Sequence, residues 1–275
     1  MNLLQALFLG ILQGFTEFLP ISSSGHLVIF QYYMGFKKPM VLFDVLLHIG
    51  TLAAVIVFFR KELKLMLISI LKPQIKDEDY SNRRWIILMV ILGTLPTAIL
   101  GAILQREQEF LFKGVFVSGG GLLFTGVFLW LAEKIGSNSN KKNCEKQKIT
   151  PIDALIIGVM QGVAIIPGIS RSGTTISTGL IKGLKREVSF QYSFFLFIPA
   201  VTGALILESR KVSLISSTPS FPVCLAGTLT SFLVGIVALK ILHKLLREKR
   251  LTIFSWYCWI FGGGVLVYEI AKIFI

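Results

Sequence analysis

Six stretches of the chain stay apolar for long enough to cross a bilayer as a helix, which takes about 20 residues. They lie near residues 41–59, 86–104, 114–132, 191–208, 222–243 and 252–274. Two further apolar stretches, residues 1–34 and 152–184, are each broken in the middle by proline, glycine and serine. Because these residues end or kink a helix, neither stretch is expected to span the bilayer as one continuous helix. The pattern predicts an all-α integral membrane protein with six spanning helices and two re-entrant helical hairpins.

Basic residues in the connections predict the orientation of these helices. Three connections are rich in lysine and arginine: Arg60, Lys61, Lys64, Lys72, Lys76, Arg83 and Arg84; Lys134, Lys141, Lys142, Lys146 and Lys148; and Lys240, Lys244, Arg247, Lys249 and Arg250. The connections between them carry only Lys37 with Lys38, Arg106 with Lys113, and Arg210 with Lys211, while Lys182, Lys185 and Arg186 follow the second broken stretch. Basic loops stay in the cytoplasm, so we expect both termini outside and the two hairpins entering from opposite faces. Since non-helical backbone at membrane depth must be buried in protein or reach water, the two breaks are expected to share a polar cavity.

The two broken stretches are similar to each other. A shift of 148 positions aligns LGILQGFTEFLPISSSG with IGVMQGVAIIPGISRSG without a gap. The matching pairs are Gly10 and Gly158, Gln13 and Gln161, Gly14 and Gly162, Ile21 and Ile169, Ser22 and Ser170, Ser24 and Ser172, and Gly25 and Gly173. Three spanning helices separate the copies, so the two halves must be inverted relative to each other. We expect a single membrane domain, residues 1–275, with repeat halves 1–134 and 150–275 joined by a basic cytoplasmic loop at 133–149.

The composition supports a membrane protein and excludes other classes. Of the 275 residues, 53% are hydrophobic and 16% charged, and the mean hydropathy of +0.73 is outside the range of soluble domains. The formal net charge of +13 could suggest nucleic-acid binding, but the basic loops already account for it, so we expect none. Cys144, Cys224 and Cys258 are too far apart to have the spacing of metal ligands.

Nearly all the strongly polar groups expected at membrane depth lie at the two breaks. They are Glu17, Ser22, Ser23, Ser24 and His26 at the first break, and Ser170, Arg171, Ser172, Thr174 and Thr175 at the second. An ionisable residue inside a membrane is costly unless paired or hydrated, and therefore indicates a functional site. Arg171 offers a planar fork of donors that suits phosphate oxygens. Gly168 and Gly173 let main-chain N–H groups approach an anion, so the second break is predicted to bind one.

The polar groups of the first break allow several roles. Glu17 could hold a divalent cation or act as a general base, while His26 could transfer a proton or attack phosphorus. Ser23 could be a nucleophile or a donor to phosphate. Structural roles are the alternative: the serines would cap the next helix, Arg171 would only pair with Glu17, and His26 would be a core histidine. Asp44 and His48, four residues apart, could line the cavity or support Glu17, but we expect mainly a structural pair.

With the motifs QGFTEFLPISSSGH and PGISRSGTT, the chain resembles the undecaprenyl-diphosphatase family of bacitracin-resistance membrane phosphatases along nearly its full length. Gln13 and Glu17 fill that family's first motif, a glutamate or glutamine followed four residues later by glutamate. The resemblance implies hydrolysis of undecaprenyl diphosphate to the monophosphate and phosphate, which recycles the carrier lipid for peptidoglycan synthesis and confers bacitracin resistance. It also implies the bacterial plasma membrane, with an active site that we expect to face outside.

The resemblance also implies residue roles. The catalytic residues would be Glu17, Ser23, His26 and Arg171, and Glu17 would also bind a divalent cation, Mg²⁺ or Ca²⁺. The residues expected to contact the substrate are Gln13, Ser22, Ser24, Ser170, Ser172, Gly173, Thr174 and Thr175. The expected partners are the polyprenyl diphosphate lipid and the bilayer, and a homodimer is left open.

Two other functions share some features of the sequence and serve as alternatives. Inverted repeats with broken helices are typical of secondary transporters, so a transporter or lipid flippase is the main alternative. The phosphatidic-acid-phosphatase type of membrane phosphatase does not fit, because its pattern needs a histidine and an aspartate where this chain has Ser177 and Ile181.

Overall fold

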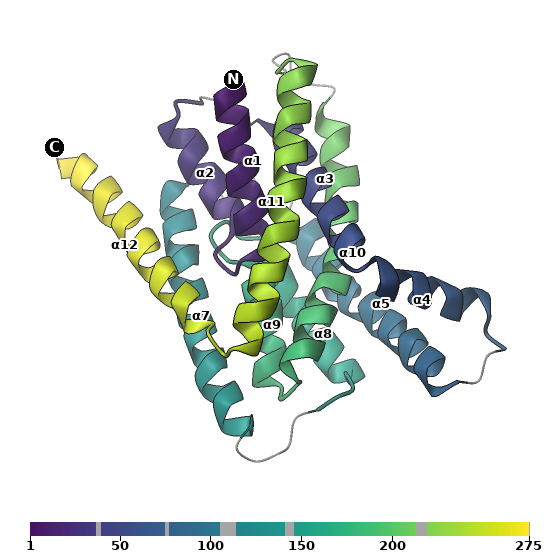
Figure 1. Cartoon of the computed structure of the whole chain (residues 1–275). Helices are drawn as coiled ribbons and strands as arrows, with labels where there is room; N and C mark the ends of the chain where they lie inside the picture. The colour runs from purple at the N-terminus through teal and green to yellow at the C-terminus, as the bar shows by residue number, and fades with distance from the viewer. Residues whose placement is uncertain (37–39, 75–76, 105–113, 141–145, 213–218, 275) are drawn as a thin grey trace.

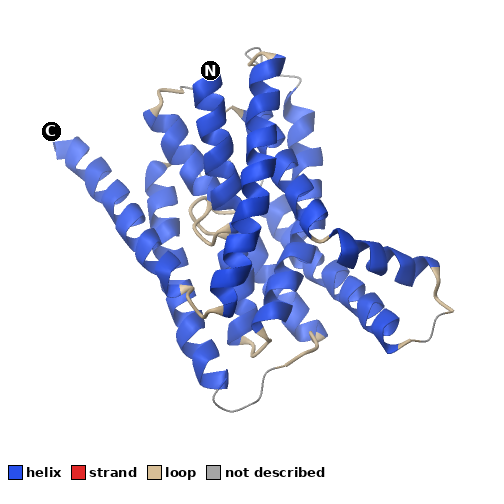
Figure 2. Cartoon of the chain, viewed as in Figure 1, coloured by secondary structure: helices blue, strands red, loops and turns tan. Residues whose placement is uncertain are grey.

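The computed structural model describes residues 1–36, 40–74, 77–104, 114–140, 146–212 and 219–274, and there the chain forms helices and no strand (Figures 1 and 2). The helices are α1 (Leu3–Phe18), α2 (Ser23–Tyr33), α3 (Val41–Phe58), α4 (Arg60–Leu71), α5 (Glu78–Leu104), α7 (Val115–Asn140), α8 (Pro151–Val163), α9 (Arg171–Ile181), α10 (Arg186–Val212), α11 (Phe221–Arg247) and α12 (Thr252–Phe274). The prediction of an all-α fold is confirmed.

Six of the described helices are long and apolar enough to span a membrane: α3, α5, α7, α10, α11 and α12. They coincide with the six apolar stretches, so the predicted number of spans is confirmed. The two chain ends lie at the same end of the molecule (Figure 1). Lys37, Lys38, Lys76, Arg106, Lys113, Lys141, Lys142 and Cys144 lie outside the described residues, as do the side chains of Arg210 and Lys211.

Helix α4 was not predicted, because the many lysines and arginines of residues 60–84 indicated a basic connection. In the structure α4 fills much of that connection, and α5 begins at Glu78, before the apolar stretch starts. These two segments project sideways from the bundle (Figure 1). A search for long apolar runs misses such helices, since their charged residues alternate with leucine and isoleucine.

Both broken stretches have the predicted form of two helices joined by a turn at membrane depth. The helices before the breaks, α1 and α8, have 16 and 13 residues, which is too short to span a bilayer alone. Each begins with a capping box, formed by Asn2 with Gln5 and by Thr150 with Asp153. Loop backbone consequently lies in the middle of the bundle rather than only at its ends (Figure 2).

Glycines allow the short helices to pack closely on spanning helices. A Cβ added at Gly10 of α1 would lie 2.6 Å from the carbonyl oxygen of Gly227 on α11. At Gly158, the counterpart of Gly10 in the repeat, a Cβ would collide with the carbonyl oxygen of Gly93 on α5. The same kind of crossing thus occurs in both copies, which supports the repeat, while the bounds of its two halves stay a prediction.

We expect the substitution Gly158→Ala to destabilise the protein by about 1–3 kcal/mol, because the new methyl group must push α8 away from α5. Thermal unfolding in detergent measures the effect. Gly203→Ala in α10 is the matched control, since no described atom lies within 4 Å of a Cβ there and alanine favours the helix. Equal stability of the two variants would contradict the close crossing of α8 and α5.

Candidate functional site

Glu17, in the last turn of α1, is the centre of a hydrogen-bonded cluster that joins the two breaks. Its Oε1 accepts a hydrogen bond from Arg171 Nη2 at 2.6 Å. Its Oε2 accepts hydrogen bonds from Ser23 Oγ at 2.5 Å and from Gln13 Nε2 at 3.0 Å. The carboxylate is buried, with 7% of the residue exposed. The structure therefore brings together four of the predicted site residues, and the breaks meet as expected.

At the first break the chain reverses between α1 and α2, which brings Ser23 into contact with Glu17. Gln13 lies one helical turn before Glu17, which puts both side chains on one face of α1. After α1 ends at Phe18, the chain reverses, and α2 begins at Ser23. Ser22, the residue before α2, has a φ of 69°, a left-handed conformation that is uncommon for serine and costs free energy.

At the second break, the loop between α8 and α9 is hydrogen-bonded to α7. These bonds fix the position of Arg171, the first residue of α9. Thr125 Oγ1 donates to the carbonyl oxygen of Gly168 at 3.0 Å and accepts from the Ser170 N–H at 2.9 Å. Gly168 has a φ of +90°, and a Cβ there would collide with the carbonyl oxygen of Ser118 on α7. Only glycine fits this position, because it tolerates both the left-handed backbone and the close approach.

Arg171 is partly buried and has unused donor capacity. Its guanidinium carbon lies 3.8 Å from the centre of the Phe197 ring on α10, which supports the planar group from one side. Nη2 is bonded to Glu17, whereas Nη1 is buried without a hydrogen-bond partner in the described part of the chain. An unpaired buried donor costs about 1–3 kcal/mol, so this nitrogen is suited to receive an oxygen of an anionic ligand.

The oxygen atoms around Glu17 partly fit a divalent cation. Gln13 Oε1 is buried and has no partner among the described residues, and it belongs to the amide whose Nε2 donates to the Glu17 carboxylate. Such oxygens suit Mg²⁺, which commonly takes one or two protein carboxylates and completes its shell with water and substrate phosphates. No group of three His, Cys, Asp or Glu residues that could hold a metal occurs in the described chain. The donor set therefore fits a cation that arrives with, or is completed by, a phosphate ligand.

His48 of α3 also faces this cluster, and sequence reasoning gave it only a minor place. Its Nε2 lies 3.7 Å from Glu17 Oε2, and its Nδ1 donates to the main-chain oxygen of Asp44 at 2.7 Å. The Asp44 carboxylate instead accepts from Gln31 Nε2 at 2.7 Å. A structural pair of Asp44 and His48 was the main expectation, but His48 bonds only the main-chain oxygen of Asp44 in the described chain, and the geometry favours its support of Glu17. The sequence did contain a signal for this role, because an ionisable histidine within an otherwise apolar span indicates a functional site.

His26 points away from Glu17. Its ring is fully buried, Nδ1 donates to the main-chain oxygen of Ser22 at 2.7 Å, and Nε2 lies 2.8 Å from the hydroxyl of Tyr257 on α12. The ring also stacks on Phe261 at 4.7 Å between centroids. Both ring nitrogens are thus engaged on the α12 side of α2, outside the cluster formed by Glu17, Arg171 and Ser23.

The remaining predicted residues shape the two turns. Ser22 and Ser170 accept hydrogen bonds from the N–H groups of Gly25 and Gly173, at 3.3 and 3.1 Å, and cap α2 and α9. The other hydroxyls bond near by: Ser24 with Ser22, Ser172 with Ser170, Thr174 with the Ser170 carbonyl oxygen, and Thr175 with Ser193 and the Arg171 carbonyl oxygen. The capping alternative thus describes Ser22, whereas Ser23 contacts Glu17.

Comparison with known proteins agrees with the motifs. The model of the family described as "Bacitracin resistance protein BacA" matches residues 6–264. The chain is 42% identical over 271 residues to an undecaprenyl-diphosphatase of Desulforapulum autotrophicum, covering 95% of this chain and 96% of that protein. It is 42% identical over 281 residues to one of Carboxydothermus hydrogenoformans, covering 98% and 99%. A third, of Halothermothrix orenii, is 40% identical over 268 residues, covering 97% and 98%.

We expect Ser170→Ala to lower the stability of the protein by about 1 kcal/mol, because α9 loses its N-cap. Ser24→Ala is the control, since among the described residues the Ser24 hydroxyl makes only a 3.4 Å contact with Ser22. Urea unfolding of both variants in detergent compares them. If Ser24→Ala costs as much stability as Ser170→Ala, the capping role of Ser170 is wrong.

Proposed function

The chain belongs to the BacA family of bacitracin resistance proteins, and from this we propose that it hydrolyses undecaprenyl diphosphate to the monophosphate and inorganic phosphate, as the name of its relatives states. The observation that carries the proposal is the contact of Arg171 with Glu17 across the two breaks. It puts an anion-binding guanidinium beside a carboxylate that already accepts a serine hydroxyl.

Arg171 is the group that we assign to the diphosphate. Its free Nη1 can donate to a phosphate oxygen while Nη2 stays on Glu17, and the Phe197 ring restricts the plane of the fork. A donor fixed before the substrate arrives stabilises charge on the transferring phosphoryl group without reorganisation. In phosphoryl transfer most of the catalytic effect comes from such positioning and charge stabilisation.

Ser23 and Glu17 form the pair that we assign to the attack on phosphorus. The hydroxyl is hydrogen-bonded to the carboxylate at 2.5 Å, which is the arrangement of a nucleophile and its base. Ser23 Oγ forms a bond to the terminal phosphorus, its proton passes to Glu17, and the bond from that phosphorus to the bridging oxygen breaks. Undecaprenyl monophosphate leaves with the bridging oxygen, and water then releases phosphate from Ser23 and restores its hydroxyl. The nitrogens of His26 are engaged elsewhere, which favours Ser23 over His26 as the nucleophile.

We assign a divalent cation, Mg²⁺ or Ca²⁺, to the oxygens of Glu17 and Gln13. When bound, it would neutralise part of the diphosphate charge. Gln13 would contribute Oε1, which otherwise lacks a partner in the described chain.

The chain is a multi-pass membrane protein, and we place it in the bacterial plasma membrane with both termini and the active site facing outside. The three basic connections lie toward the end opposite the two termini (Figure 1), and the positive-inside rule then puts the termini outside. There the enzyme would meet the carrier lipid released by cell-wall synthesis. The names of the relatives do not support the alternative of a transporter or flippase.

Phosphate release from undecaprenyl diphosphate by the purified protein tests the activity. We expect Glu17→Ala, Ser23→Ala and Arg171→Ala each to lower kcat by about a hundredfold or more, since each removes a group that acts in the transition state. Arg250→Ala, at an exposed site near Glu248, is the control and should keep the wild-type rate. Near-wild-type turnover of the Glu17 and Arg171 variants would remove the proposal, and intact substrate after incubation with wild type would favour transport.

The nucleophile is tested by rapid acid quenching followed by mass spectrometry of the peptides. We expect phosphate on the peptide that contains Ser23 in wild type and in His26→Ala, because the covalent intermediate forms on Ser23. No phosphopeptide should form in Ser23→Ala. Recovery of phosphate on His26, by a quench that preserves phosphohistidine, would show that the roles are reversed.

A further inference from the structure

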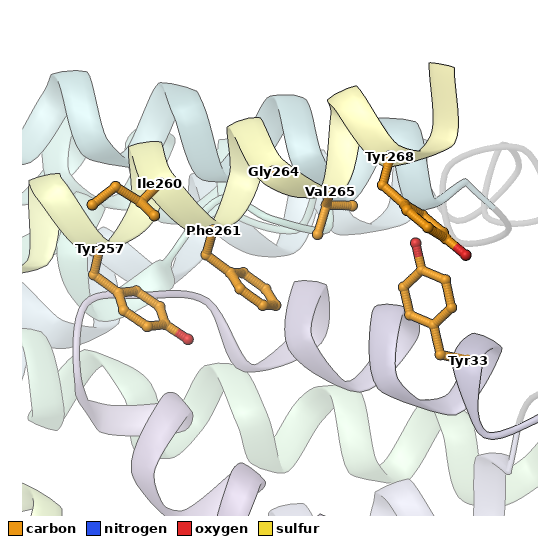
Figure 3. A pocket seen from close by; sticks show the side chains of 7 residues that line it. All are labelled: Tyr33, Tyr257, Ile260, Phe261, Gly264, Val265 and Tyr268. Carbon is orange, nitrogen blue, oxygen red and sulfur yellow. The ribbon is translucent and has the colours of Figure 1, made fainter. Parts of the chain in front are cut away.

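A groove of about 550 Å³ lies between α2 and α12 on the outside of the bundle. Figure 3 shows its lining: Tyr257, Phe261, Gly264 and Tyr268 come from α12, and Tyr33 faces them from α2. The walls are almost entirely aromatic or aliphatic. Several lining side chains are open to the surroundings, with Tyr268 58% and Ile260 74% exposed. In a membrane this face meets lipid, not water, so the groove is accessible to hydrocarbon.

The contacts between α2 and α12 beside the groove follow one face of α2, whose first turn carries Ser23. Ser23, His26, Phe30 and Tyr33 are spaced by three or four residues and therefore form one stripe on the helix. The rings of His26 and Phe30 lie 4.7 and 6.1 Å from Phe261. Tyr33 lies 5.7 Å from Tyr268, between ring centroids. An aromatic path thus runs along α2 from the turn with Ser23 to the far end of the helix.

Two hydrogen bonds join α2 and α12 near the two ends of the groove. Near the Ser23 end, His26 Nε2 pairs with the Tyr257 hydroxyl at 2.8 Å. At the other end, the Tyr33 hydroxyl donates to Glu269 Oε1 at 2.9 Å. Tyr257 and Tyr268 are eleven positions apart, which corresponds to roughly 16 Å of helix. The groove therefore extends along α12 between two fixed contacts, and its walls are mainly apolar.

We propose that this groove binds the isoprenoid chain of the diphosphate substrate, with the units nearest the head against Tyr257 and Phe261. The inference rests on the proposed function, since the chain must leave the Ser23–Arg171 site while remaining in the bilayer. A flexible hydrocarbon chain matches a groove whose lining is mainly apolar and whose Tyr257 and Tyr33 hydroxyls are already hydrogen-bonded. The Tyr257 end of the groove is linked to the first break, because Tyr257 bonds to His26 and His26 bonds to the Ser22 carbonyl oxygen. This proximity favours the isoprenoid chain over a phospholipid acyl chain or a second copy of the protein.

Adjacent glycines of α12 offer a matched pair of variants. Gly264 lines the groove, whereas Gly263 does not, and a Cβ at either position would meet no described atom within 4 Å. Gly264→Leu fills part of the groove, and Gly263→Leu adds the same side chain elsewhere on the same helix. Steady-state kinetics are measured with undecaprenyl diphosphate and with dimethylallyl diphosphate, whose chain is a single isoprene unit. The ratio of the two kcat/KM values reports how much the long chain contributes.

We expect Gly264→Leu to lower the preference for the long substrate about tenfold, through a higher KM for undecaprenyl diphosphate. This is the loss of affinity expected when roughly two methylene groups of the substrate are no longer buried in the groove. Gly263→Leu should keep the wild-type ratio. A wild-type ratio in Gly264→Leu, or an equal loss in Gly263→Leu, would overturn the groove as the chain site. So would a change in the oligomeric mass of Gly264→Leu alone, which would indicate a contact between copies. If wild type releases no phosphate from either substrate, the proposed function itself fails.

Photocrosslinking gives a readout that does not depend on turnover. An undecaprenyl diphosphate with a diazirine on an isoprene unit near the head should label peptides of α12 around Phe261 and Gly264. Labelling should be competed by unmodified undecaprenyl diphosphate but not by phospholipid. Label confined to other helices, or competed equally by phospholipid, would contradict the assignment.

Discussion

The buried ion pair between Glu17 and Arg171 is the interaction on which the rest of the site depends. Each charge alone would be expensive at membrane depth, whereas the pair lets both persist there. The two residues come from α1 and from the first position of α9, so their contact also fixes how the two breaks meet. Arg171 Nη1 and Gln13 Oε1 have no hydrogen-bond partner in the described chain. One donor and one acceptor beside the ion pair therefore remain available for a ligand.

The surrounding fold serves to hold two interrupted helices against each other. Capping serines begin α2 and α9, Thr125 fastens the second turn to α7, and glycine crossings let α1 and α8 approach their neighbours closely. Aromatic packing completes the support, since the Phe18 ring at the end of α1 packs on Phe194 and Phe197 of α10. The same Phe197 lies against the guanidinium of Arg171. Irregular backbone is tolerated here because protein buries most of it.

The sequence was informative where local physics decides the structure. Long apolar runs predicted the six spans, and proline, glycine and serine predicted both breaks. The rarity of charge at membrane depth singled out Glu17 and Arg171. Side-chain directions that depend on distant helices were not predictable: His26 turns toward Tyr257, 231 positions away, and His48 approaches Glu17 from another helix. Helix α4 escaped detection because its mixed polarity resembles that of a loop.

The difference between the two copies of the repeat has a consequence for how such a site can arise. Ser23 and Arg171 occupy the same position in the aligned copies, and Ile165 stands where the first copy has Glu17. Two identical copies would place arginine opposite arginine or serine opposite serine, and neither combination provides both a hydroxyl and a guanidinium beside one carboxylate. Because both copies lie in one chain, corresponding positions can carry different residues, and two similar breaks can together form an asymmetric site.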